Sequence, residues 1–224
     1  MELGARAEIV WSEKAPWTPA ELAANHAAVV TLSETKPNPR TNYAGFGNDV
    51  QTAPYWVVPR PRLDSAIPSR TNIKSALNNG TIPIGVNPNG TTYLVDRITT
   101  RSLNGSYNDY RIRDAHKVTI CDFFGEDLLA KTVLQFGGKR ISDDVPEGAP
   151  PPGPSVVTPA RYRSCVFGLL DSYNSNDLLQ NIDEIKAGTI VQRETNPSTR
   201  LAIRIPLQPI DNAKQFAIAV DQVA

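Results

Sequence analysis

A β-hairpin is predicted by the stretch Ile84-Gly85-Val86-Asn87-Pro88-Asn89-Gly90-Thr91-Thr92-Tyr93-Leu94-Val95. Its centre, Asn89-Gly90, is a strong signal of a tight turn when apolar, β-branched and aromatic residues flank it. The second strand continues into Arg97-Ile98-Thr99-Thr100. Upstream, residues 69–77 predict a short helix, and Gly80 suits the left-handed conformation that ends such helices. This part of the chain therefore mixes helix and strand.

Further helices are predicted in four places. The first begins at Thr18-Pro19, a capping residue followed by proline at the first helical position, and continues over the Ala-rich residues 20–30. The second covers residues 109–135, where apolar residues recur at helical spacing. The third begins at Thr158-Pro159, and the fourth covers residues 176–188. Together with the hairpin, these helices predict an α+β fold.

The last part of the chain changes to the period of a strand. Apolar residues alternate with other residues in two runs, which residues 206–214 join into an expected two-strand unit. A two-stranded ribbon is marginally stable alone, and a neighbouring chain can add a strand to its edge. The apolar residues of the two runs are therefore candidates for strands shared between subunits: Leu201, Ile203 and Ile205, then Phe216, Ile218 and Val220.

The charge balance bears on the partners of the chain. Among 224 residues, 23 are basic and 23 are acidic, so the formal net charge is zero. Nucleic-acid binders usually carry a basic excess, because neutralising phosphates supplies much of their affinity. We therefore expect no nucleic-acid partner. A net charge near zero also weakens self-repulsion, which permits dense self-association.

The cysteines and the apolar pattern bear on the compartment. Cys121 and Cys165 are far apart and form neither a disulfide framework nor a zinc-binding CxxC pair, so a reducing cytoplasm is expected. Residues 1–25 lack the apolar run of a signal peptide. The sequence contains no stretch of about 18 apolar residues, which a membrane-spanning helix would need. No membrane insertion is therefore expected.

One set of residues could carry chemistry. Cys121, His116 and Asp122 could form the nucleophile, base and acid of a small hydrolase. In a helix over residues 109–135, however, His116 and Cys121 would point to different faces. The alternative is that Cys121 and Cys165 are small buried hydrophobic residues. We predict no catalytic, cofactor-binding or metal-binding residue, and no cofactor.

Acidic pairs and tryptophans each have two interpretations. Asp143-Asp144 and Glu126-Asp127 could act as acid–base or metal-binding pairs, but no further ligand follows at a motif spacing, which favours solvated charges. Trp11, Trp17 and Trp56 could form a peptide-binding groove, or they could anchor the core or loops.

Six arginines fall in three close pairs, which could form charge pairs between subunits. The alternative is a solvated face or pairing within the chain. The pairs are Arg97 with Arg101, Arg111 with Arg113, and Arg161 with Arg163.

Several motifs follow one another along the chain. They are Pro37-Asn38-Pro39-Arg40-Thr41-Asn42-Tyr43-Ala44-Gly45, then Asn78-Asn79-Gly80-Thr81-Ile82-Pro83-Ile84-Gly85-Val86, then Asn89 through Arg97-Ile98-Thr99-Thr100, then Arg113-Asp114, Phe136-Gly137-Gly138-Lys139 and the closing strands. In this order they resemble the C-terminal half of contractile phage tail sheath proteins of the Mu-like group. The resemblance runs from about residue 20 to the end. Such proteins usually have an N-terminal arm and further domains, so we expect the sequence to correspond to only part of such a protein.

The resemblance implies a mechanical function. It implies a virion structural protein that assembles around a tail tube and contracts to drive the tube through the host envelope, leading to genome ejection. Residues 1–100 would be the remnant of a mixed α/β sheath domain, and residues 101–224 a C-terminal domain with a helical layer on a small sheet facing the tube. Residues 215–224 would be an arm that adds a strand to a neighbour.

The implied partners are other copies of the chain in a homo-oligomer, the tail tube protein, and the baseplate and tail terminator proteins. The implied location is the phage tail, after assembly in the host cytoplasm. A subunit of a phage-derived contractile injection system is an alternative within the same class, and the Cys/His hydrolase is an alternative outside it.

Overall fold

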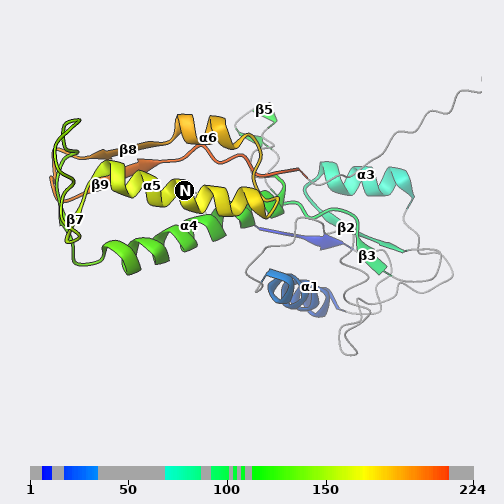
Figure 1. Cartoon of the computed structure of the whole chain (residues 1–224). Coiled ribbons are helices and arrows are strands. Elements are labelled where there is room, and N and C mark those ends of the chain that lie inside the picture. Colours follow the sequence, from blue (N-terminus) through cyan, green and yellow to red (C-terminus); the bar gives the residue numbers. More distant parts are fainter. Residues whose placement is uncertain are drawn as a thin grey trace, which may run out of the picture. The chain divides into compact units, whose positions relative to one another are not determined.

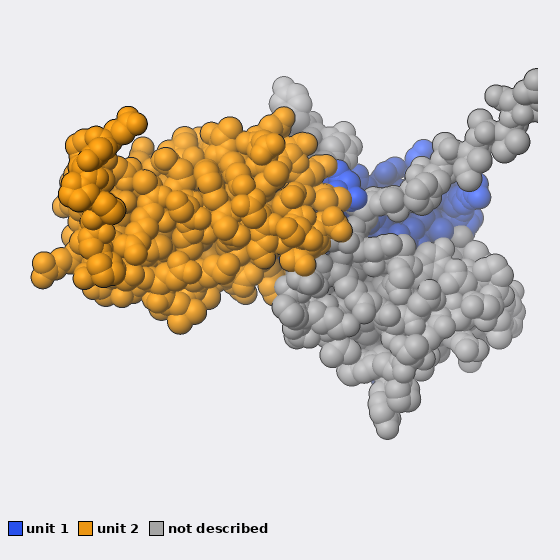
Figure 2. Space-filling model, in the orientation of Figure 1, with its two compact units in different colours: residues 1–119, 211–224 blue, residues 120–210 orange. Residues whose placement is uncertain are grey.

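The computed structural model gives the chain an α+β fold of helices packed with small sheets, as the sequence predicts (Figure 1). It describes residues 7–11, 18–34, 69–86, 92–100, 103–104, 107–108 and 113–211. The chain divides into two compact units, coloured separately in Figure 2: unit 1, residues 1–119 with 211–224, and unit 2, residues 120–210. The domain boundary expected near residue 100 stays a prediction.

Three strands form the sheet of unit 1. β2 (Ile82–Val86) pairs antiparallel with β3 (Thr92–Leu94) and parallel with β1 (Val10–Trp11). The two hairpin strands predicted on either side of Asn89-Gly90 are therefore confirmed, while turn residues 87–91 lie outside the described ranges. Ile82 and Ile84 are buried. β2 is thus the central strand of the sheet, and its buried side chains Ile82 and Ile84 stabilise the sheet by apolar burial.

The first helix, α1 (Pro19–Glu34), begins where the sequence predicts. The N–H of Glu21 donates to Thr18 Oγ1 at 3.3 Å, and the N–H of Thr18 donates to Glu21 Oε2 at 2.8 Å. This reciprocal pair is a capping box, which satisfies two backbone donors that the helix itself cannot. The hydrogen bond from the Thr18 backbone, with that from its hydroxyl, lowers the pKa of the Glu21 carboxyl.

The second described helix, α3 (Arg70–Asn78), is capped by Ser69 Oγ, which accepts from the N–H of Asn72 at 3.1 Å. Gly80 follows it with φ of 71°, as predicted. A Cβ on Gly80 would lie 3.0 Å from the backbone of Thr100. Only glycine meets both the left-handed conformation and this close approach without strain.

The long helix α4 (Ala115–Phe136) begins later than the predicted residue 109. Before it, β4 (Leu103–Asn104) and β5 (Tyr107–Asn108) form a short antiparallel pair that the sequence did not predict. The β-branched run 118–120 is tolerated in α4 because Ile120 is buried and Thr119 Oγ1 donates to the carbonyl of Ala115 at 3.1 Å. Packing and local bonding thus outweigh a modest propensity cost.

Unit 2 contains most of α4 and the elements that follow it. In Figure 1, α5 lies between α4 and the β8–β9 hairpin, and α5 contacts both β8 and α6. Two short parallel strands, β6 and β7, precede α5. The elements are β6 (Arg140–Ile141), β7 (Val156–Val157), α5 (Pro159–Ser175), α6 (Ile182–Gly188), β8 (Ile190–Arg193) and β9 (Leu201–Arg204).

Aromatic contacts hold α4 against α5. The rings of Phe124 and Tyr173 meet edge to face with centroids 5.1 Å apart, and the Tyr173 hydroxyl donates to Asp127 Oδ2 at 2.6 Å. Burial, together with this hydrogen bond to a carboxylate, raises the pKa of the Tyr173 hydroxyl. One turn further, Thr132 Oγ1 lies 2.7 Å from the hydroxyl of Tyr162. Each tyrosine therefore buries its ring and still satisfies its polar end.

The N-terminus of α5 is capped as predicted. Thr158 Oγ1 accepts from the N–H of Arg161 at 3.3 Å, and Pro159 occupies the first turn. Asp144 Oδ1 accepts from the N–H of Ala160 at 2.8 Å. A negative carboxylate at this end also suits the helix dipole. Asp144, one of the predicted solvated acids, is exposed but has this capping role.

The helix predicted over residues 176–188 is shorter than expected. α6 begins at Ile182, and the segment before it contains two residues with positive φ, Asp177 and Asn181. Leu178 and Leu179 are buried, but in an extended segment in which Leu179 bridges to Pro209. Short apolar runs do not distinguish helix from strand by period, which explains the difference.

Candidate assembly surface

Two of the six candidate strand residues, Leu201 and Ile203, lie on the β8–β9 hairpin of unit 2. β8 and β9 pair antiparallel in the register Ile190 with Arg204, Val191 with Ile203, Gln192 with Ala202, and Arg193 with Leu201. The sequence predicted β9 but not β8. The run Ile190-Val191 is too short to show alternation by itself, and only its pairing with β9 makes it a strand.

The predicted side chains of the first run pack inward. Leu201 and Ile203 lie in β9, and Ile205 lies just after its end. All three are partly buried and pack against the core of unit 2. Their side chains therefore stabilise the unit, and what β9 can offer a second chain is its backbone edge. Whether these residues serve in assembly stays a prediction.

The second run, Phe216, Ile218 and Val220, lies outside the described ranges. The expected pairing of the Leu201–Ile205 region with residues 215–224 therefore stays a prediction. Within the described part of the chain, the β8–β9 sheet has two strands. A sheet of two strands has outer edges at which a further strand can pair.

The segment that follows β9 is hydrogen-bonded to residues 178–180 of unit 2. The N–H of Gln180 donates to the carbonyl of Gln208 at 3.0 Å, and the N–H of Ile210 donates to the carbonyl of Leu178 at 3.1 Å. At β8, Arg163 Nη2 donates to the carbonyl of Val191 at 3.2 Å. The hairpin is therefore positioned by α5 and by residues 178–180, rather than by its own strand pairing alone.

Several hydrogen bonds and ion pairs stabilise the turn of the hairpin. The N–H of Glu194 donates to the carbonyl of Arg200 at 2.9 Å, and Arg200 Nη2 donates to Glu194 Oε1 at 2.7 Å. Arg193 Nε donates to the carbonyl of Ser198 at 2.6 Å, and its Nη1 lies 3.2 Å from Asp143 Oδ2. These contacts give the turn one conformation, so the strands cannot slip easily in register.

The paired arginines that are described bond within the chain. Arg113 Nη2 donates to the carbonyl of Leu77 at 2.9 Å, and Arg161 Nη1 donates to the carbonyl of Val156 at 3.0 Å. Arg163 supports β8 as above, and Arg97 pairs with Glu8. These contacts favour the interpretation of pairing within the chain for these four. Arg101 and Arg111 lie outside the described ranges.

A buried charge cluster surrounds Glu8 in unit 1. Arg97 donates to its carboxylate, and His26 Nε2 lies 2.8 Å from Glu8 Oε2. Burial raises the pKa of Glu8, but the hydrogen bonds from His26 and Arg97 and the charge of Arg97 outweigh it, so the pKa is held below its usual value. The cluster connects the N-terminal segment to α1 through His26 and to residues 95–100 through Arg97, and no pattern in the sequence predicted it.

The residues of the hypothetical hydrolase all lie on α4. His116 is buried, while Cys121 and Asp122 are partly buried. Five positions separate His116 from Cys121, which corresponds to about 140° around a helix. The backbone therefore directs the two side chains to different faces, as the sequence predicts.

The described ranges contain no group of three or more His, Cys, Asp or Glu side chains placed to hold a metal ion. None of the described helices is both long and apolar enough to cross a membrane.

Comparison with known proteins assigns the fold. No protein family matches the sequence, and no curated protein matches it. Among solved structures, the sheath tail protein of Desulfitobacterium hafniense superposes with a TM-score of 0.56 at 14% identity, over 87% of this chain and 39% of that protein. The sheath tail protein of Listeria innocua matches at a TM-score of 0.47 and 13% identity, over 68% of this chain and 34% of that one. The chain therefore has a fold like that of part of a sheath tail protein.

Proposed function

We propose that this chain is a structural subunit of a contractile phage tail sheath, and not an enzyme. The observation that carries the proposal is the superposition of 87% of the chain on the Desulfitobacterium hafniense sheath tail protein. At 14% identity the likeness rests on the arrangement of helices and strands rather than on shared side chains. The chain spans 39% of that protein's length. From the order of motifs along the sequence, we further propose that it corresponds to the C-terminal half of a Mu-like sheath subunit.

Assembly would use two features of unit 2. The first is the outer edge of the β8–β9 sheet, to which an extended segment of a second copy, residues 215–224, would add a strand. The second is one exposed face of α4, where Leu129 and Val133, four positions apart, are 65% and 62% exposed. Large apolar side chains gathered on one surface commonly mark a protein–protein interface.

Contraction would then follow from repacking of such interfaces. Backbone hydrogen bonds of an added strand can persist while the domains that they link rotate, so the lattice stays connected as it shortens. The extended sheath would store free energy that contraction releases, and no cofactor is required. The partners would be other copies, the tail tube, the baseplate and the tail terminator, and residues 101–224 would face the tube.

Negative-stain electron microscopy of the purified chain at high concentration, with light scattering on the same sample, tests the proposal. Rings, stacked discs or tubes are expected. The chain with residues 215–224 removed serves as the comparison, and Arg204→Glu as a matched control that changes charge on β9 without removing backbone. A monodisperse monomer at every concentration, with circular dichroism of a folded α+β protein, would contradict self-assembly of this chain.

A further inference from the structure

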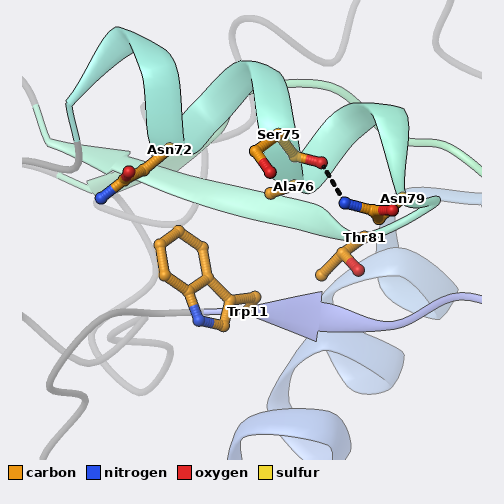
Figure 3. A pocket seen from close by; sticks show the side chains of 6 residues that line it. All are labelled: Trp11, Asn72, Ser75, Ala76, Asn79 and Thr81. Atoms are coloured by element: carbon orange, nitrogen blue, oxygen red, sulfur yellow. Dashed lines mark hydrogen bonds between the residues drawn. The ribbon is translucent and has the colours of Figure 1, made fainter.

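A hollow of about 320 Å³ lies in unit 1 between α3 and β1 (Figure 3). The described residues that line it are one tryptophan, one alanine and four residues with uncharged polar side chains: Trp11, Asn72, Ser75, Ala76, Asn79 and Thr81. Its volume is at the lower end for small-molecule sites, which begin at about 300 Å³. None of these lining residues belongs to the buried core, and none lies on the proposed assembly surface of unit 2.

The polar side of the hollow is one face of α3. Asn72, Ser75 and Asn79 recur at the three- and four-residue spacing that aligns side chains on a helix. Figure 3 shows them on the side of α3 that faces the indole of Trp11. α3 buries none of its residues. Asn72, Ser75 and Asn79 are exposed, and their polar groups are therefore accessible to a ligand.

Trp11 is held in place by its backbone. β1 pairs with β2 in the register Val10 with Ile82 and Trp11 with Pro83, and the N–H of Ile82 donates to the carbonyl of Ile9 at 2.7 Å. The indole is only partly buried. An aromatic face fixed by a sheet and open to solvent can bind a ligand at low entropic cost.

Hydrogen-bonding capacity remains around this indole. Asn79 Nδ2 donates to the carbonyl of Ser75 at 2.9 Å, which leaves the Asn79 amide oxygen as an acceptor. Within the described ranges, no hydrogen bond involves the side-chain amide of Asn72 or the hydroxyls of Ser75 and Thr81. The described lining also contains no charged side chain. It therefore suits a neutral ligand with many hydroxyls better than a phosphate, a carboxylate or a cation.

We propose that this hollow binds a neutral saccharide. One face of a pyranose ring consists of C–H groups, which are attracted to the electron-rich face of an indole. Stacked on Trp11, the ring would direct its hydroxyls toward the amides and hydroxyls of α3 and Thr81. Binding is weak for one ring, because only one aromatic contact and a few exposed hydrogen bonds stabilise it.

The fluorescence of Trp11 can be measured alone in a variant that lacks the other two tryptophans. In the double variant Trp17→Phe/Trp56→Phe, Trp11 is the only indole, since the chain has three tryptophans. Its fluorescence is titrated with glucose, galactose and N-acetylglucosamine, with glycerol as the solvent control. At least one sugar is expected to give a saturable change with a Kd on the order of 1–10 mM. Saturation-transfer NMR on the unmodified chain gives the same readout if the double variant does not fold.

Two further variants separate the site from a general effect. Asn72→Ala is expected to weaken binding about three- to tenfold, the usual effect of one lost hydrogen bond. Lys74→Ala, on the same helix but outside the lining, should leave it unchanged. No saturable response to any sugar by either method would overturn the proposal. So would a response only to Pro-rich peptides, which would make the hollow a peptide site, or equal affinities for Asn72→Ala and the parent.

Discussion

Arg97 and Glu8, 89 positions apart in the sequence, form a bidentate pair in which Nε and Nη2 of Arg97 donate to Glu8 Oε1 at 2.9 and 2.7 Å. Both side chains are largely buried, with exposed fractions of 7% for Arg97 and 16% for Glu8. A buried ion pair contributes little net stability compared with an apolar pair, but removing one partner leaves a buried charge uncompensated. The pair therefore makes the position of the N-terminal segment sensitive to single substitutions.

Glu8→Gln is expected to lower the free energy of unfolding by about 3 kcal/mol, because it removes the carboxylate charge that pairs with the buried Arg97 guanidinium. Urea denaturation of the parent and the variant measures the difference. Glu21→Gln is the matched control, since Glu21 is a fully exposed carboxylate that caps α1, and its substitution should lower stability clearly less than Glu8→Gln. Equal losses in the two variants would contradict a special role for Glu8.

The same pair predicts a dependence of stability on pH. The pKa of Glu8 is held below its ordinary value of 4.5, so the folded state favours the ionised carboxylate. Its contribution is therefore fully present above pH 4.5 and is lost as the pH falls through the folded-state pKa. Denaturation midpoints between pH 7 and pH 3 should fall more steeply for the parent than for Glu8→Gln. Parallel curves would show that Glu8 does not titrate in this way.

Gly80→Ala is expected to destabilise the chain by about 2 kcal/mol, because it adds strain at a positive φ and a close contact with the Thr100 backbone. Gly148→Ala is the control: Gly148 also has a positive φ, 84°, but a Cβ there meets nothing within 4 Å. It should cost only about 1 kcal/mol, the strain alone. Thermal denaturation of both measures the difference, and an equal effect would mean that the contact with Thr100 is unimportant.

Tyr173→Phe is expected to lower the free energy of unfolding by about 1–2 kcal/mol, since it removes a hydrogen bond to a carboxylate while keeping the ring contact with Phe124. Phe124→Ala, which removes the ring partner from the core, should cost about 3–5 kcal/mol. Chemical denaturation followed by circular dichroism distinguishes the two. If Tyr173→Phe does not change the free energy of unfolding, water hydrogen-bonds the Asp127 carboxylate as well as the Tyr173 hydroxyl does.

Deleting residues 215–224 is expected to reduce oligomer yield more strongly than Arg200→Glu or Arg204→Glu, because strand addition rests on backbone hydrogen bonds and not on these exposed charges. Sedimentation and electron microscopy of the three variants measure the yield. Equal yield after the deletion would count against residues 215–224 as the added strand, and a larger loss with either charge reversal would place the interface on side chains.

Leu129→Ser with Val133→Ser is expected to reduce assembly without lowering stability by more than about 0.5 kcal/mol, because both side chains are exposed on the same face of α4. Gln135→Ser, an exposed neighbour on the same helix, is the control. Light scattering against concentration compares the variants. Unchanged assembly would exclude this face of α4 as an interface.

Local signals in the sequence predicted the start of several elements. Thr18 and Thr158 cap helices where expected, and Gly80 has its left-handed conformation, because each of these features depends on residues within about four positions. The hairpin strands around Asn89-Gly90 are likewise local. The sheath-like fold was predicted from the order of such motifs, and superposition on a solved sheath tail protein supports it.

Features that join distant segments could not be predicted. β8 is a strand because it pairs with β9, and Leu178 and Leu179 are extended, not helical, because residues 208–210 pair with them. The hollow beside Trp11 exists because β1 brings residue 11 next to a helix that begins at residue 70.

By itself, the sequence determined the helix caps, the strands β2 and β3 and the fold class, since backbone groups near in the chain are satisfied by neighbours whose identity can be read directly. The tertiary structure alone decided the pairing of β1 with β2, the pairing of β8 with β9 and the partner of the buried carboxylate of Glu8. Many partners compete for one edge or one carboxylate, and the choice among them is made by the packing of the whole unit, as Glu8 and Arg97 illustrate.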